Sequence, residues 1–391
     1  MRRTRYILPE QPSRPRERKP LFLNRLWKHL LWIVPLILAD VLLFGLLRSC
    51  RGRGDAAVEG VPLEPVVTAQ VAVASTPWRD FVFPTEQTRL LEGVTADVFQ
   101  PTASGNPESA LYGSVRTAKN GGGLMPSFHE GIDIAAMRRD RQGRPLDAVR
   151  AVADGTVGYV NRIGGNSNYG IYVVLLHDDP IGEVYTLYAH LAEVPKTLRA
   201  GQNVSAGDVI GTMGNTSSGG IPMQRAHLHF EIGLINNERF ASWYRAQKLK
   251  PDHGNFHGRN FFGVDPLKFI KNQRQNPELD FRSHLATLPP AFEIVLAARN
   301  RPEFFRRYPS LWSGPDFDGG PMVLSCSENG TPLGGRCSTD AERLTLGKSR
   351  CVVLKADEAV LGRNGCRLVV KSSKGWKLGR KGEEWLEILT Y

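Results

Sequence analysis

Three observations predict that this chain folds mainly as antiparallel β sheet. Between residues 98 and 270, short β-branched and aromatic runs alternate with Gly, Asn and Asp, as at 155–160 and 169–177. Helical periodicity is sparse there, and the clearest helical segments are 239–248 and 266–273. With 391 residues, 41% of them hydrophobic, the chain is long enough to bury a full core and to form two folded units.

The N-terminal region is predicted to anchor the chain in a membrane. Residues 30–47 are apolar apart mainly from Pro35 and Asp40, a length close to the roughly 20 residues that span a bilayer as helix. A mid-helix Asp costs about 3 kcal/mol, whereas each of the thirteen Leu, Ile, Val and Phe residues returns about 0.3 to 0.6, so insertion is favoured. We therefore expect a cytoplasmic basic segment at 1–29, one transmembrane helix at 30–47 and a linker with short strands at 48–97.

Basic residues gather before this apolar run. Nine Lys and Arg residues among the first 28 account for much of the formal charge of +11. By the positive-inside rule the N-terminus lies in the cytoplasm, and everything after about residue 50 lies outside, in the periplasm. No zinc-finger spacing, RNP-like stretch or phosphate-binding loop supports a nucleic-acid partner. A cleaved signal peptide and a lipid-modified Cys50 are the alternatives to the anchor.

The C-terminal quarter carries an even set of four cysteines, Cys326, Cys337, Cys351 and Cys366. Such a set can form two disulfides, in any of three pairings, and is consistent with export. A zinc knot is the competing interpretation, which the lack of a Cys-x-x-Cys pair and of a nearby His disfavours. We expect residues 272–391 to form a smaller β-rich, disulfide-containing domain. It could bind anionic glycan, bind an envelope protein partner or cap the preceding domain.

Two short stretches place residue types that bind metals on one face of a strand. His129 and Asp133 are four residues apart, and His227 and His229 are two apart, so each pair leaves the same face of a strand. Neutral imidazoles and carboxylates are natural zinc ligands. A third stretch places His190 at the end of an apolar run. Each pattern alone often arises by chance, but together they are far more specific.

The order of these five residues, with Gly-rich turns between the strands, resembles the lysostaphin-type (LytM-like) zinc metalloendopeptidases, a peptidoglycan peptidase family. Further segments in the family's order lie at 112–116, 153–157, 207–216 and 264–267. The resemblance covers less than half of the chain and implies a zinc peptidase domain at 98–271. Two features depart from the family's pattern. The stretch 217–226 is longer than usual and ends in Ala226 in place of a common Pro, and residues 234–263 form an insertion that would be a lid or part of the substrate wall.

The resemblance also implies a site. His129, Asp133 and His229 would bind one Zn²⁺, which leaves a fourth position for a water of lowered pKa. His190 would stabilise the oxyanion of the scissile carbonyl, while His227 would hold the water and pass its proton to the leaving amine. The implied function is zinc-dependent hydrolysis of peptide cross-links in bacterial peptidoglycan. The alternative is a non-catalytic or latent LytM-like regulator that activates other cell-wall hydrolases.

Other polar residues near these motifs have simpler interpretations. On a strand, Glu130 should point away from His129, toward solvent or a partner. Glu231 shares the face of His229 and could orient it, and Arg116 could line the substrate groove. Three further histidines are expected outside the site, the first as a structural strand residue and the other two in a solvent-exposed loop: His177, His253 and His257.

Overall fold

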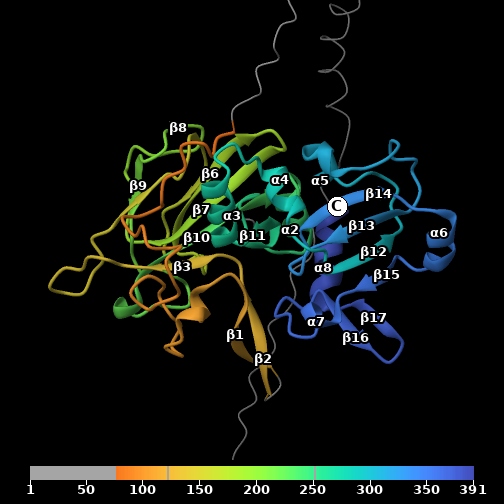
Figure 1. Ribbon diagram of the computed structural model, residues 1–391, viewed down its shortest axis with the longest axis horizontal. Coiled ribbons are helices and arrows are strands. Elements are labelled where there is room, and N and C mark those ends of the chain that lie inside the picture. The colour runs from red at the N-terminus through yellow and green to blue at the C-terminus, as the bar shows by residue number, and fades with distance from the viewer. Residues whose placement is uncertain (1–75, 121–122, 251) are drawn as a thin grey trace, which may run out of the picture. The chain divides into compact units, whose positions relative to one another are not determined.

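The computed structural model describes residues 76–120, 123–250 and 252–391 (Figure 1). The expected basic segment, the transmembrane helix and the Val-rich pieces of the linker lie outside these residues. No helix within the described ranges is long and apolar enough to cross a membrane. The described residues form one unit by their contacts.

A seven-stranded antiparallel sheet, the main sheet, carries the candidate site. Its strands run in the order β11-β10-β7-β6-β5-β8, and β3 pairs with β10 beyond the stretch that β11 occupies. The strands are β3 (Ile132–Ala135), β5 (Gly155–Asn161), β6 (Ile171–Asp179), β7 (Gly182–Leu191), β8 (Asn203–Val204), β10 (His227–Ile235) and β11 (Phe261–Val264). All of these pairings are antiparallel, which confirms the predicted fold class.

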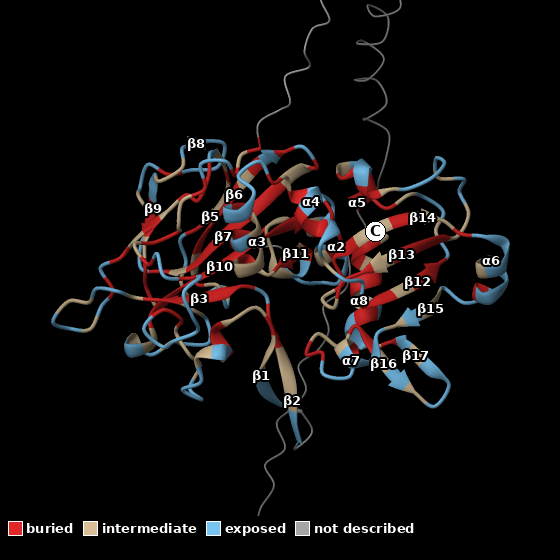
Figure 2. Ribbon diagram, in the orientation of Figure 1, coloured by how far each residue is buried: buried red, intermediate tan, exposed pale blue. Residues whose placement is uncertain are grey.

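Side-chain alternation along β10 separates packing from chemistry. Leu228, Phe230 and Ile232 enter the main hydrophobic core, while His227 and His229 leave the other face. Every residue of β10 is buried, because both faces of the strand are covered. Figure 2 shows the strands of the main sheet largely in the buried colour. The imidazoles of His227 and His229 are therefore shielded from solvent, although the apolar residues of β10 alternate as in any strand that packs on a core.

Smaller elements surround the main sheet. A hairpin of β1 (Gly113–Asn120) and β2 (Gly123–His129) pairs Gly113 with His129, and β4 (Ala148–Arg150) pairs with β9 (Val209–Thr212). The 3-10 turn η1 (Pro107–Ala110) precedes the hairpin in the chain, and a second 3-10 turn, η2 (Met223–Arg225), precedes β10.

Residues 76–97, expected to belong to a linker with strands, instead pack against the core without forming a strand. Trp78 is fully buried, and its Nε1 donates to Asp179 at 2.7 Å. Phe81 and Leu90 join the same core. Large apolar side chains in this stretch are better buried than exposed, so the folded part of the chain begins before residue 98.

Both predicted helices of the central region form, as α2 (Phe240–Ala246) and α3 (Pro266–Gln275). Helix α3 begins where Asp265 accepts a hydrogen bond from the Leu267 N–H, with Pro266 in the first turn. Helix α2 and the 3-10 turn η3 (Gly258–Asn260) belong to the predicted insertion, which leaves the sheet after β10 and returns as β11.

The insertion packs as a wall. Phe256 stacks on Tyr159 of the sheet with ring centroids 5.5 Å apart, and Phe240 and Trp243 pack against Ile388 near the C-terminus. These aromatic side chains bury large areas on both sides, which opposes opening. Of the two roles that the sequence left open, the contacts favour part of the cleft wall over a lid.

The segment after residue 275 begins with α4 (Phe281–Ala286) and continues as a β-rich part. A four-stranded antiparallel sheet runs in the order β14-β13-β12-β15, and β16 and β17 form a hairpin. The remaining elements are β12 (Phe292–Leu296), α5 (Phe304–Arg307), η4 (Pro309–Leu311), β13 (Met322–Cys326), β14 (Pro332–Cys337), α6 (Asp340–Leu346), β15 (Cys351–Ala356), α7 (Glu358–Leu361), β16 (Val369–Ser372), β17 (Gly375–Leu378) and α8 (Arg380–Leu389).

The expected disulfides are absent from the described residues, where all four cysteines of this part are free. Cys337 and Cys351 lie on β14 and β15, with β13 and β12 between them. Three strand spacings amount to about 14 Å, whereas bridged cysteines have Cα atoms within about 7 Å. Cys326 is buried on β13, and burial raises the pKa of its thiol well above the usual range. The strand order therefore excludes a Cys337–Cys351 bridge, and the described structure does not bear out the expected disulfides in any other pairing.

Candidate metal centre

Sheet pairing brings three predicted ligands together from two distant stretches of chain. Asp133 on β3 lies directly opposite His229 on β10, and His129 ends β2 just before β3. His129 Nε2 lies 3.0 Å from His229 Nδ1 and 3.1 Å from Asp133 Oδ1, and the latter two atoms are 3.0 Å apart. All three side chains are buried. In the described part of the chain, this is the group of His, Cys, Asp and Glu side chains that could hold a metal ion.

Hydrogen bonds on the outer side of each imidazole determine which nitrogen faces this cluster. His129 Nδ1 donates to the Leu111 carbonyl at 2.7 Å, and His229 Nε2 donates to Glu231 Oε1 at 2.9 Å. In the neutral rings, lone pairs on the other nitrogens therefore meet a carboxylate oxygen of Asp133. Three acceptors that face one another repel until a cation lies among them.

The donor set fits zinc. Two imidazoles and one carboxylate are a common ligand set for a catalytic zinc, which keeps one position open. Ligands bound tetrahedrally at about 2.0–2.1 Å lie about 3.3 Å from one another. The observed separations of 3.0 to 3.1 Å need to widen by only a few tenths of an ångström.

The same cluster holds a proton strongly when no metal is bound. Burial alone would lower the pKa of His229, but its hydrogen bonds to Asp133 and Glu231 outweigh burial and raise that pKa to about 9. Burial would raise the pKa of Asp133, yet the imidazoles of His129 and His227 hold it well below the usual range. A metal ion must therefore displace a proton from this site.

The two remaining predicted histidines lie beside the cluster. His227 Nε2 is 3.4 Å from Asp133 Oδ1, and the ring centroids of His190 and His227 are 4.9 Å apart. His227 Nδ1 donates to the Arg225 carbonyl at 2.6 Å, and His190 Nδ1 donates to the Thr216 carbonyl at 2.9 Å. In both neutral rings Nε2 is thus the nitrogen that carries a lone pair, the form that a general base needs.

His190 also has an unusual backbone. Its φ of 62° lies in the left-handed region, which non-glycine residues seldom adopt and which is often found at functional sites. Burial, helped by the neighbouring His227 and His229, lowers the pKa of His190 well below its usual value. The fold therefore holds this imidazole neutral in a strained position.

Two residues support the ligands from outside. Glu231, left undecided by the sequence, accepts hydrogen bonds from His229 and from the hydroxyls of Tyr169 at 2.7 Å and Tyr185 at 3.0 Å. Arg116, expected only to line the groove, donates to Asp133 Oδ2, and its Nη2 lies 3.0 Å from His129 Nε2. A cation at the cluster requires Arg116 to leave His129, while its bond to Asp133 can remain.

The histidines expected outside the site divide into one confirmed and two corrected predictions. His177 is buried and structural, bonded to the Asp154 carbonyl at 2.7 Å and to Thr186 at 2.8 Å. His253 is only 7% exposed and contacts the Tyr159 hydroxyl at 3.2 Å, while His257 is half-buried. The two are not in an exposed loop, because the insertion packs against the sheet.

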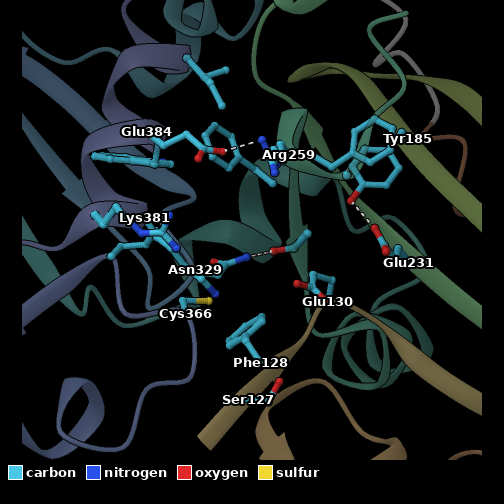
Figure 3. Close-up of a pocket in the computed structure, with 18 residues that line it drawn as sticks. Ser127, Phe128, Glu130, Tyr185, Glu231, Arg259, Asn329, Cys366, Lys381 and Glu384 are labelled. Atoms are coloured by element: carbon cyan, nitrogen blue, oxygen red, sulfur yellow. Dashed lines mark hydrogen bonds and ion pairs between the residues drawn. The ribbon is translucent and has the colours of Figure 1, made fainter. Parts of the chain in front are cut away.

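Two cavities adjoin the metal centre. The first, here called the insertion cavity, measures about 500 Å³ and lies between the insertion and the loop that carries Asn168 and Tyr169. The second, the helix cavity, measures about 510 Å³ and lies between the main sheet and α8 (Figure 3). Neither is lined by the three ligands themselves. Glu130, which follows the ligand His129, lines both, as do Gly258 and Arg259, so the two cavities are neighbours.

Solved structures with a similar fold include three peptidase-related proteins. The catalytic domain of the antimicrobial peptidase lysostaphin from Staphylococcus simulans is 23% identical and covers 41% of this chain and 89% of its own, with a TM-score of 0.27. The catalytic domain of the prophage-encoded M23 protein EnpA from Enterococcus faecalis is also 23% identical, with coverages of 32% and 82% and a TM-score of 0.22. A zinc-containing peptidase from Vibrio cholerae is 23% identical, with coverages of 36% and 44% and a TM-score of 0.22.

No curated protein matches this chain. Residues 127–241 match the model of peptidase family M23. The matched segment contains all five predicted site residues, which the fold brings to one place. This part of the chain is therefore a LytM-type domain of peptidase family M23.

Proposed function

We propose that this protein is a zinc-dependent endopeptidase that hydrolyses peptide cross-links of bacterial peptidoglycan. The observation that carries the proposal is the convergence of three metal-ligand atoms within 3.1 Å of one another, inside a segment that matches family M23. Two imidazoles lie beside them, each tied to a carbonyl through Nδ1. A buried set of acceptors with two bases next to it suits metal-assisted hydrolysis.

His129 Nε2, Asp133 Oδ1 and His229 Nδ1 would hold the ion. When bound, zinc supplies Lewis-acid polarisation of a carbonyl and lowers the pKa of a water. Glu231 orients His229, and Arg116 orients Asp133 through the oxygen that does not face the cluster. These outer contacts keep the ligand atoms in place without occupying them.

The proposed roles of His227 and His190 depend on their Nε2 atoms, because the Nδ1 atom of each ring is hydrogen-bonded to a backbone carbonyl. His227 would accept a proton from the attacking water through Nε2 and return it to the leaving amine, with its ring held by the Arg225 carbonyl. His190 would donate to the oxyanion of the scissile carbonyl from Nε2, for which the proton of the neutral ring would lie on Nε2 and the hydrogen bond from Nδ1 to the Thr216 carbonyl would be given up.

The test is release of new free amines from purified peptidoglycan by the protein, with and without a chelator. We expect amine release that the chelator abolishes and added zinc restores. His227→Ala should retain zinc, because it is not a ligand, and should lose at least about a hundredfold in rate. A protein that binds zinc and peptidoglycan but releases no amine would instead support the latent LytM-like regulator.

We also propose that residues 30–47 anchor the chain in the cytoplasmic membrane, with the peptidase domain in the periplasm. The apolar run and the nine basic residues before it support this topology. Protease added to spheroplasts should digest the domain from outside and leave the N-terminal segment protected. A domain that is digested only after the cells are lysed would contradict the topology.

A further inference from the structure

The helix cavity is built by two distant parts of the chain. One wall comes from the end of β2 and from the main sheet, and includes Glu130, Tyr185 and Glu231. The opposite wall is one side of α8, from Arg380 to Ile388, which presents Lys381 and Glu384 (Figure 3). Its volume of about 510 Å³ lies within the range of ligand-binding pockets. The family match ends at residue 241, so the α8 wall lies outside it.

Three of the six charged residues that line this cavity have partners in other residues. Arg259 pairs with Glu384 at 3.2 Å, and both carboxylate oxygens of Glu231 accept hydrogen bonds. Arg380 and Lys381 differ, because neither side chain has a hydrogen-bond or ion-pair partner in the part of the chain that the structure describes, and among the acidic lining residues only Glu130 likewise has no partner in another residue. Two unpaired cations therefore lie side by side in sequence at the start of α8 and line the same cavity.

The helix cavity also lies next to the metal centre. Glu130 follows the ligand His129 and lines the cavities on both sides. Glu231, bonded to the ligand His229, lines the helix cavity. A peptide whose scissile bond lies at the metal centre would therefore reach the helix cavity by passing Glu130 and Glu231.

The lining indicates the chemistry of what extends there. Phe128, Phe261 and Trp385 offer apolar surface for aliphatic carbons. Arg380 can hold a carboxylate through two parallel hydrogen bonds, and Lys381 adds a second positive charge. Gly379 gives α8 no side-chain cap, so the first N–H groups of the helix add to the positive potential at the same end.

We infer that the helix cavity is a substrate subsite that binds a free carboxylate of the peptide, with Arg380 and Lys381 as specificity-determining residues. The inference rests on the proposed function, since it takes the substrate to be a cell-wall peptide. The inference assigns the segment after residue 272 a role in recognising the substrate next to the metal centre.

The experiment compares two synthetic stem peptides that differ only in the glutamyl α-carboxylate, which is free in one and amidated in the other. Binding is measured with the full chain carrying His227→Ala, and kcat/KM with the active chain. We expect the free acid to bind about fivefold more tightly, the upper end for exposed ion pairs, and this preference to weaken with salt. Arg380→Gln combined with Lys381→Gln should remove the preference and leave the affinity for the amide unchanged.

The matched control is Lys374→Gln combined with Lys377→Gln. It removes the same charge from the β16–β17 hairpin, and neither residue lines the cavity. Loss of the preference in this control would show an effect of net charge and overturn the subsite, as would equal binding, or no binding, of the two peptides to the parent chain.

Binding and cleavage separate the two proposals. A preference that depends on Arg380 and Lys381 in a chain that releases no amine would support the subsite and reject the peptidase. Cleavage without such a preference would do the reverse.

Discussion

Glu231 accepts a hydrogen bond from His229 Nε2 at 2.9 Å, and this bond turns the Nδ1 of the same ring toward Asp133. Glu231 is itself held by two tyrosine hydroxyls, so its position does not depend on the metal. A carboxylate behind a ligating imidazole fixes the tautomer and makes the ring a stronger ligand.

Glu231→Gln should therefore weaken zinc binding by at least about tenfold, because the imidazole loses its anionic partner. The measurement is competition for zinc with a chromogenic chelator. Glu193→Gln, an exposed residue outside the site, is the control and should change nothing. Equal zinc affinity in the Glu231 variant and the parent chain would show that the contact does not tune the ligand.

Arg116→Gln should lower the rate of amine release by about 10- to 100-fold, since Asp133 loses the charged group that orients it. Lys119→Gln on the same strand removes an exposed charge and is the matched control. The rates are compared at saturating zinc, so that weaker metal binding does not contribute. An unchanged rate would leave Arg116 as a groove residue only.

His190 supplies a test of backbone strain. Glycine tolerates a φ of 62° and alanine does not, so His190→Gly should be more stable to urea than His190→Ala by about 1 kcal/mol. Both variants should lose activity, because both lack the imidazole. An alanine variant as stable as the glycine variant would argue against a strained position.

His177 should make stability depend on pH. Burial lowers its pKa to about 4 in the folded chain, from about 6.5 when unfolded. Between these values the unfolded chain binds more protons, so stability falls as the pH drops from about 6.5 to 4, by roughly 3 kcal/mol in all. Above pH 6.5 both states are neutral and the effect vanishes.

Urea unfolding at several pH values, with His177→Gln for comparison, measures this contribution. The glutamine variant is less stable at pH 7, since two buried hydrogen bonds change, but its stability should fall less steeply below pH 6.5. Other buried histidines, such as His284, add slope to both proteins and cancel in the difference. Identical slopes would assign the acid sensitivity elsewhere.

Local pattern was enough to predict the sheet and the pairs of candidate ligands that share a strand face, whereas the set of three ligands at one ion came from the family resemblance. Alternation along 227–232 places both imidazoles on one face, and the packing of Leu228 and Phe230 keeps that face aligned. The pairing of Asp133 with His229 follows once both strands join one antiparallel sheet.

Contacts between segments that are distant in the sequence could not be predicted from local pattern. Arg116 meets Asp133 because a whole hairpin folds over β3, which no short stretch of sequence encodes. The number of cysteines suggested disulfides, but the strand order that separates Cys337 from Cys351 depends on the whole C-terminal sheet. His253 was placed in solvent because the packing of the insertion cannot be predicted from its own residues.

Gly365 leaves no room for a side chain, because a Cβ there would collide with the backbone of Ser127 and Phe128, and its N–H donates to Ser114 at 2.7 Å. The hairpin that ends in His129 is thus clamped from the far end of the chain. The segment 127–241 therefore depends on the C-terminal part of the chain. If it were transferred alone to another protein, it would lose the contact with Gly365 that holds the strand of its first ligand, His129. A substitution at or near Gly365 should therefore change the affinity for metal at His129, although the two positions are over two hundred residues apart in the sequence.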